Sequence, residues 1–377
     1  MKTILVTGSA GFMGRNLTEY LRRKKDITLL RFDMTDTDET LSDHLKAADV
    51  VFHLAGVNRP LQEEDFVTGN AGLTMRIVAR LLERRIKPLL VFSSSIQAAL
   101  DNPYGRSKRQ AEAALEEYGA LGGPAVIARL ANVFGKWSRP NYNSAVATFC
   151  HNIARGLEIT ISDPERIMEL VYIDDVMAAF DALLEEPEPV PGVRRVNIGP
   201  VTTITLGALV KELYQMRDIR DGLLLPDLQD RFRRSLYATY VSFLPEDDFS
   251  YDLLKREDQR GALAELLKSP HFGQLFISRT HPGFVRGNHF HHTKVEKFCV
   301  LEGEALIRFR HISNGNVLTY PVSGTEFRVV DIPPGYTHSI ENVGERELVV
   351  LFWSSELFDL NAADTYPLAV AITTEDP

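Results

Sequence analysis

A cluster of imidazole and carboxylate side chains stands near the end of the chain. His289 and His291 are two residues apart, Glu296 follows, and His338 comes after a Pro-Gly turn. Residues i and i+2 of a strand point to the same face, so the first two imidazoles should converge. Three imidazoles and one carboxylate suit Zn²⁺, Ni²⁺, Mn²⁺ or Fe²⁺. We therefore predict a metal site of these four side chains; the alternative is a metal-free site in which the histidines act as acid–base groups or pack.

A second group of residues is typical of proton transfer to a carbonyl. Tyr104 and Lys108 are four residues apart, so a helix would bring them to one face. A nearby ammonium lowers the pKa of a phenol, and we predict Tyr104 as general acid with Lys108 as its partner. Ser94 and Ser95 end the preceding apolar strand, where a hydroxyl can hydrogen bond the same carbonyl oxygen.

Nucleotide binding is indicated by the first residues of the chain. The segment TGSAGFMG follows a strand and opens a helix. Glycines there let the backbone approach a pyrophosphate, and the helix N-terminus supplies free N–H groups. We expect the cofactor to contact this loop, which contains Gly8, Ser9, Gly11, Phe12, Met13 and Gly14.

The end of the second strand bears on the choice between NAD and NADP. Asp33 can accept a hydrogen bond from a free ribose 2′-hydroxyl, which favours NAD, whereas Arg31 can contact a 2′-phosphate, which favours NADP. The residues alone leave both open.

Two kinds of pattern divide the chain. Over about 200 residues, apolar strand-like runs alternate with helical spacing, which predicts a doubly wound α/β fold with a parallel sheet. The stretch DRFRRSLYATYVSFLPEDDFSY is predicted to connect the two parts. From about Gly273 the segments are short, strand-like and punctuated by glycine, which predicts an all-β barrel. We place the domains at residues 1–243 and 244–377.

Composition excludes several classes of protein. The net charge of −9 argues against a sequence-independent nucleic-acid binder. No apolar run is long enough to span a bilayer, and no leader precedes the first strand, so we expect a cytoplasmic protein without membrane contact. Cys150 and Cys299 are far apart and are expected to be free thiols.

The N-terminal part resembles the extended short-chain dehydrogenase/reductase family. The resemblance lies in TGSAGFMG, HLAG, SSS, PYGRSK and YIDD and covers about residues 1–240. It implies catalysis by Tyr104 and Lys108 with help from Ser94 or Ser95, of which Ser95 matches best. It also implies two contacts with ligands. The cofactor would meet Leu54, Ala55, Gly56 and Asn70, and Asn132 would meet the phosphates of a nucleotide sugar, unless it only caps a strand end.

The C-terminal part resembles a cupin barrel, and the whole chain resembles the bifunctional capsular-polysaccharide synthesis enzymes of the CapF type. Gly283-x₅-His289-x-His291-x₄-Glu296-x₆-Gly303 is similar to the first cupin motif, and PPGYTHSIEN to the second. The resemblance implies a UDP-4-keto-6-deoxy-N-acetylhexosamine substrate, epimerised at C3 in the cupin and reduced at C4 with NADPH to UDP-2-acetamido-2,6-dideoxy-L-talose, a precursor of UDP-N-acetyl-L-fucosamine. It also implies a bound metal, Zn²⁺ first, and a homodimer formed through the cupin.

Two questions stay open. If all four cluster residues bind a metal, the C3 base must be another residue, and the candidates are Lys294, Lys297, His292 and Tyr336. The rival function is a C4 reductase whose cupin serves only dimerisation or ligand sensing.

Overall fold

The protein forms two compact units. The computed structural model describes residues 1–57, 66–186, 189–313, 315–359, 361 and 363–371. The first unit comprises Met1–Tyr214 and Arg234–Pro245, and the second comprises Gln215–Arg233 and Glu246–Pro377. The domain boundary between residues 243 and 244 stays a prediction.

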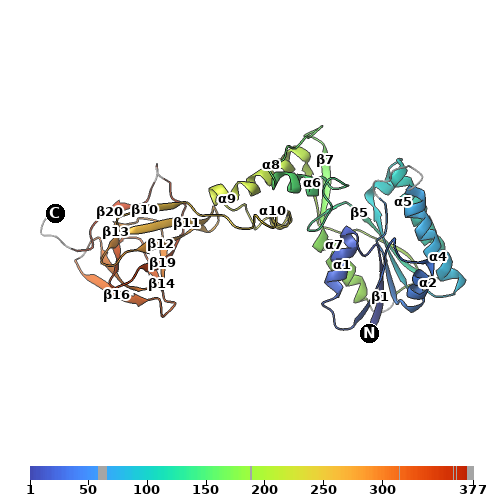
Figure 1. Ribbon diagram of the computed structural model, residues 1–377, viewed down its shortest axis with the longest axis horizontal. Helices are drawn as coiled ribbons and strands as arrows, with labels where there is room; N and C mark the ends of the chain where they lie inside the picture. Colours follow the sequence, from blue (N-terminus) through green and yellow to red (C-terminus); the bar gives the residue numbers. More distant parts are fainter. Residues whose placement is uncertain (58–65, 187–188, 314, 360, 362, 372–377) are drawn as a thin grey trace. The chain divides into compact units, whose positions relative to one another are not determined.

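A parallel six-stranded sheet forms the centre of the first unit (Figure 1). Its strands lie in the order β2-β1-β3-β4-β5-β8, and every neighbouring pair is parallel. The inner strands β1, β3, β4 and β5 are mostly apolar and buried because helices cover both faces. The strands are β1 (Lys2–Thr7), β2 (Ile27–Phe32), β3 (Val50–His53), β4 (Leu89–Ser95), β5 (Pro124–Leu130) and β8 (Gly192–Val196).

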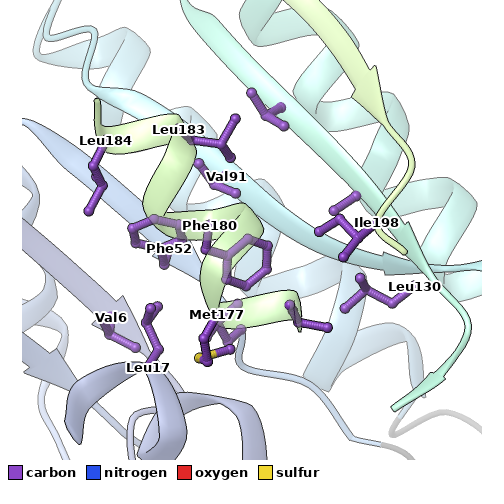
Figure 2. Packing of buried hydrophobic residues seen from close by; sticks show 14 of the residues in the cluster. Val6, Leu17, Phe52, Val91, Leu130, Met177, Phe180, Leu183, Leu184 and Ile198 are labelled. Carbon is purple, nitrogen blue, oxygen red and sulfur yellow. The ribbon is translucent and has the colours of Figure 1, made fainter. Parts of the chain in front are cut away.

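Helices cover both faces of this sheet. On one face α1 (Phe12–Leu21) and α7 (Ile173–Leu184) pack Leu17 and Phe180 against the strands, as Figure 2 shows. On the other face lie α2 (Asp38–Ala47), the α4 helix (Leu73–Glu83) with the π-helical turn Val67–Gly72 before it, and α5 (Pro103–Ala120). The predicted doubly wound α/β fold is confirmed.

Smaller elements complete the helical part of the chain. A three-stranded sheet has the order β6-β7-β9. The stretch predicted as a mere connection contains a helix, α10, because Leu236 and Tyr240 recur one turn apart and both are buried. None of the described helices has the length and apolar character needed to cross a membrane. The remaining elements are β6 (Asn132–Phe134), β7 (Ile167–Tyr172), β9 (Val201–Thr205), the 3₁₀ turn Ile96–Ala99, α6 (Ala145–Ile153), α8 (Leu206–Arg217), α9 (Ile219–Gly222) and α10 (Arg231–Val241).

The second unit is built from two antiparallel sheets (Figure 1). Their orders are β10-β11-β12-β19-β14-β17 and β16-β15-β18-β13-β20, and both contribute side chains to one apolar core. This confirms the predicted all-β C-terminal domain. The strands are β10 (Lys255–Asp258), β11 (Gly261–Ser269), β12 (Gly273–Thr280), β13 (Val285–Phe290), β14 (Glu296–Glu302), β15 (Glu304–His311), β16 (Val317–Ser323), β17 (Val329–Ile332), β18 (Tyr336–Asn342), β19 (Leu348–Ser354) and β20 (Tyr366–Pro367).

Candidate functional site

The loop after β1 has glycines at positions where a side chain would not fit. Gly8 has a φ of +68°, and a Cβ there would lie 2.7 Å from Cα of Ala55. A Cβ on Gly14 would lie 2.0 Å from the carbonyl oxygen of Gly8. The loops after β1 and β3 therefore pack together at the carboxyl ends of neighbouring strands, where the strand order reverses and α/β sheets bind nucleotides. This arrangement fits the expected dinucleotide.

The other predicted residues of the loop have different surroundings. Gly11 is the N-cap of α1, and its N–H donates to the carbonyl of Gly8 at 3.0 Å. Ser9 is buried, whereas the side chains of Phe12 and Met13 pack against the apolar core. Both of those last two side chains are partly buried, so part of each stays accessible.

Asp33 and Arg31 lie differently at the end of β2. The Asp33 carboxylate accepts a hydrogen bond from the hydroxyl of Ser9 and one from the N–H of Ala10 at 3.1 Å. Asp33 thus braces the glycine loop, while Arg31 is exposed. A guanidinium open to solvent is available to a 2′-phosphate.

Asn70 links the loop after β3 to α5. It is buried, its Oδ1 accepts from the N–H of Val57 at 2.7 Å, and its Nδ2 donates to the hydroxyl of Ser107 at 3.0 Å. A Cβ on the exposed Gly56 would lie 2.9 Å from that same Oδ1, and Leu54 is buried beside it. The amide of Asn70 therefore fixes the backbone of the loop after β3.

A buried histidine, His53, directly precedes this loop and was not among the predicted site residues. His53 ends β3, with Nδ1 2.7 Å from the hydroxyl of Thr7 and Nε2 2.8 Å from that of Thr74. Burial, aided by the charge of Lys108, lowers the pKa of His53 to about 3, so the ring is neutral. In the sequence, the one indication of a role for His53 was its position in the HLAG segment.

Tyr104 and Ser95 come together as predicted. Their side chains hydrogen bond, which lowers the pKa of the phenol, but burial has the larger effect and raises it to about 12. The expectation that Lys108 lowers this pKa is wrong for the protein alone, because Tyr104 is desolvated before any ligand is considered. Tyr104 therefore keeps its proton at neutral pH.

Lys108 lies beneath the phenol, near the start of α5. Its Nζ donates to the carbonyl of Ser93 at 2.9 Å and lies 4.8 Å from the centroid of the Phe92 ring and 5.8 Å from that of Tyr104. Burial lowers the pKa of Lys108 to about 8, and Glu112 opposes this shift.

Ser94 points away from Tyr104. Its hydroxyl donates to Oε1 of Glu112 at 2.5 Å, and Arg129 holds the same carboxylate through hydrogen bonds of 2.9 and 2.6 Å. Neighbouring residues of a strand face opposite sides, so only one of the two serines can reach the phenol. The geometry favours Ser95.

Asn132, the predicted contact for the sugar nucleotide, lies at the start of β6. Its Nδ2 donates to the carbonyl of Glu169 at 2.9 Å. That bond links the start of β6 to the middle of β7, which fits the alternative of a strand-end cap.

The four predicted metal-ligand residues converge in the second unit. One ligand atom from each lies within 4.8 Å of the others. His289 and His338 are paired across β13 and β18, and a bulge at Asn288, with a φ of +59°, adjusts the register. Glu296 begins β14, in the other sheet.

The chemistry of the cluster fits a cation. Nε2 of His291 and both ring nitrogens of His338 are buried without hydrogen-bond partners among the described residues. Nε2 of His291 lies 3.4 Å from Oε2 of Glu296, and Nε2 of His338 lies 3.5 Å from it. Burial alone would raise the pKa of Glu296, but the two imidazoles outweigh it and lower that pKa; burial lowers the pKa of His289 to about 4. Three imidazoles around a carboxylate are a suitable donor set for Zn²⁺.

The four candidates for the C3 base differ in burial and in their contacts with the histidine cluster. Lys294 is largely buried, with Nζ 3.7 Å from Oε1 of Glu296. Lys297 is exposed and pairs with Asp331, and His292 is exposed beside Tyr366. Tyr336 packs edge-on against His311. Of the four candidates, Lys294 lies within ion-pair distance of a cluster residue.

Comparison with protein families divides the chain in the same two parts. The NAD dependent epimerase/dehydratase family matches residues 4–199, and the polysaccharide biosynthesis C-terminal domain matches residues 256–366.

Individual relatives match nearly the whole chain. UDP-2-acetamido-2,6-beta-L-arabino-hexul-4-ose reductase of Pseudomonas aeruginosa is 42% identical over 97% of this chain and 98% of its own. The crystal structure of the capsular polysaccharide assembling protein CapF from Staphylococcus aureus has a TM-score of 0.88 at 42% identity, covering 97% of this chain and 99% of that one. CapF with the inhibitor 3-isopropenyl-tropolone has a TM-score of 0.84 at 38% identity, over 97% and 99% of the two chains.

Proposed function

Because the chain belongs to the NAD-dependent epimerase/dehydratase family and, over its whole length, to the CapF type of capsular polysaccharide proteins, we propose that it reduces a UDP-4-keto-6-deoxy-N-acetylhexosamine. The first unit reduces the C4 ketone with NADPH. The second, a cupin, epimerises C3. The product is UDP-2-acetamido-2,6-dideoxy-L-talose, a precursor of UDP-N-acetyl-L-fucosamine for surface polysaccharide.

One observation carries the proposal. Tyr104 and Ser95 are hydrogen bonded beside the buried Lys108, in a chain that is 42% identical throughout to a keto-sugar reductase. Bound NADPH would supply a hydride to C4. Tyr104 donates its phenolic proton to the ketone oxygen, Ser95 donates a hydrogen bond to the same oxygen, and the Lys108 ammonium stabilises the tyrosinate that results. The ketone, the hydride and the proton together give the alcohol, so the reaction balances.

The preference for NADPH over NADH rests on the end of β2. Arg31 is exposed there, while the Asp33 carboxylate is engaged by Ser9 and Ala10. A free cation suits the 2′-phosphate, and a carboxylate already bonded to the loop is a poor acceptor for a 2′-hydroxyl.

The proposed C3 epimerisation uses the same ketone. A C3–H beside a C4 carbonyl is acidic, because the carbonyl takes up the charge as an enolate. The side chains of His289, His291, Glu296 and His338 would hold a divalent ion, Zn²⁺ in the first instance, which would supply Lewis acidity. Reduction then traps one epimer, which accounts for the presence of both units in one chain. We place the enzyme in the cytoplasm, as a homodimer formed through the cupin.

Incubation with UDP-4-keto-6-deoxy-N-acetylhexosamine in D₂O tests the proposal. Without NADPH, NMR should show deuterium entering C3; with NADPH, it should show the talo configuration at C3 and C4. Tyr104→Phe should abolish reduction and retain deuterium exchange, whereas His291→Ala should do the reverse. Reduction without any C3 exchange would support the rival function, a reductase whose cupin only dimerises or senses a ligand.

A further inference from the structure

The chain returns to the histidine cluster after its last long strand. Residues 363–370, which we call the C-terminal strap, include β20, where Pro367 pairs with His289. The N–H of Leu368 donates to the backbone carbonyl of Asn288 at 2.9 Å, and the N–H of Val370 donates to the side-chain Oδ1 of Asn288 at 3.2 Å. The strap is thus attached to the bulge that sets the register of His289.

Two further side chains anchor the strap to the sheet. Arg310, which is buried, donates to the carbonyl of Ala369 at 2.6 Å and to that of Val370 at 3.0 Å. The hydroxyl of Thr337, next to His338 in β18, donates to the carbonyl of Leu368 at 2.5 Å. These are fixed, buried contacts, so the position of the strap is tied to the strands that carry the cluster.

Asp364 holds the turn between β13 and β14. Its carboxylate accepts from the backbone N–H of His292 at 2.9 Å and from those of Thr293 and Lys294 at 2.8 Å each. The hydroxyl of Thr293 donates to it as well, at 3.1 Å. The turn that separates His291 from Glu296 is therefore closed around one carboxylate that lies more than sixty residues further along the chain.

The backbone of Asp364 acts directly on a cluster residue. Nδ1 of His291 lies 2.5 Å from the Asp364 carbonyl oxygen. A carbonyl can only accept, so Nδ1 must carry a proton, and Nε2 is the ring nitrogen that faces Glu296. His338 has no such partner: both of its ring nitrogens lack one among the described residues.

We propose that the C-terminal strap, through Asp364, is a positioning device that holds His291 in the Nδ1–H tautomer with Nε2 facing the cluster. A hydrogen bond to the second nitrogen of a histidine fixes ring orientation and raises the basicity of the ligating nitrogen. The expected effect on metal affinity rests on the proposed role of the cluster. The orientation and tautomer of the His291 ring do not depend on that role.

Zinc titration of the metal-stripped full-length protein against a chelating dye tests the consequence. Asp364→Ala keeps the backbone carbonyl but removes the carboxylate that fixes the turn at residues 292–294. The carbonyl should then move away from His291, and zinc binding should weaken roughly 10- to 100-fold, the usual effect of losing such a partner. Asp359→Ala is the matched control, since that carboxylate accepts from the N–H of Asn361 and should leave affinity within about twofold. Asp364→Asn, which keeps one acceptor oxygen, should give an intermediate loss and serves if the alanine variant fails to fold.

Long-range ¹H–¹⁵N NMR of histidine-labelled apoprotein tests the ring itself. The His291 signals, assigned with His291→Gln, should report the Nδ1–H tautomer in the wild type and lose it in Asp364→Ala. Unchanged tautomer and unchanged zinc affinity in that variant would overturn the inference while leaving the metal role intact. If the wild type binds no zinc, the metal role falls, and a tautomer change in the variant still supports the positioning of His291.

Discussion

Ser95 hydrogen bonds the phenol of Tyr104, although the two belong to different elements, a strand end and a helix start. Ser94, its neighbour, is bound to Glu112 on the opposite side of the strand. The two hydroxyls are adjacent in sequence and have separate tasks.

Ser95→Ala should therefore reduce activity, whereas Ser94→Ala should reduce stability. The first should lower kcat for ketone reduction about 10²-fold, the usual cost of one donor to a developing oxyanion. The second removes a donor to a buried carboxylate and should lower the free energy of unfolding by roughly 1–3 kcal/mol with kcat nearly unchanged. Steady-state kinetics and urea denaturation of both variants check this, and a larger kcat loss in Ser94→Ala would refute the assignment.

The rate of reduction should fall as the pH rises through about 8. Burial lowers the pKa of Lys108 to about 8, and the ammonium is lost above it, whereas Tyr104, with a pKa raised to about 12, keeps its proton. Glu112 opposes the shift in Lys108, so Glu112→Gln should move the alkaline limb of the kcat/KM profile to lower pH. A limb at the same pH in both proteins would show that another group is responsible.

His53 should make the fold sensitive to acid. Its folded pKa is lowered to about 3 from 6.5, so between these values the unfolded chain binds more protons and stability is lost as the pH falls. Relative to His53→Gln, the wild type should lose roughly 2–3 kcal/mol of unfolding free energy between about pH 7 and about pH 4.5. Urea denaturation at the two pH values measures it; parallel losses in both proteins would contradict the prediction.

Arg31→Ala should weaken NADPH more than NADH. Loss of an exposed cation that meets the 2′-phosphate should raise the Kd of NADPH about tenfold, or roughly 1.4 kcal/mol, while NADH, which lacks that phosphate, is unaffected. Fluorescence titration with both cofactors gives the ratio. Equal effects on the two would remove Arg31 from cofactor selection.

His338→Ala and His292→Ala separate the cluster from its surroundings. His338 is buried in the cluster and should be required for zinc binding, whereas His292 is exposed against Tyr366 and should be dispensable. Elemental analysis of both purified variants, with C3 deuterium exchange as the second readout, distinguishes them. Zinc retained by His338→Ala would contradict the four-residue site.

Local spacing was enough to predict the fold class and several residues that the structure brings together. Periodicity identified the parallel sheet and the barrel, and the i, i+2 rule brought His289 and His291 together despite an unpredicted bulge at Asn288. Spacing could not show that burial outweighs the charge of Lys108 at Tyr104, since desolvation depends on tertiary packing.

Long-range partners were beyond the reach of the sequence. Nothing near Asp364 distinguishes it from other acidic residues, and its contact with His291 spans 73 positions. Likewise, whether Ser94 or Ser95 faces the phenol depends on the rotation of β4 relative to α5, which no local pattern encodes.

The first unit is discontinuous, because Arg234–Pro245 belongs to it although Gln215–Arg233 does not. That returning piece brings Leu236 and Tyr240, both buried, and Arg155 donates to the carbonyl of Phe243 at 2.8 Å. During synthesis on the ribosome, we therefore expect the first unit to complete its core only after residue 245 has been translated, when part of the second unit has already been made.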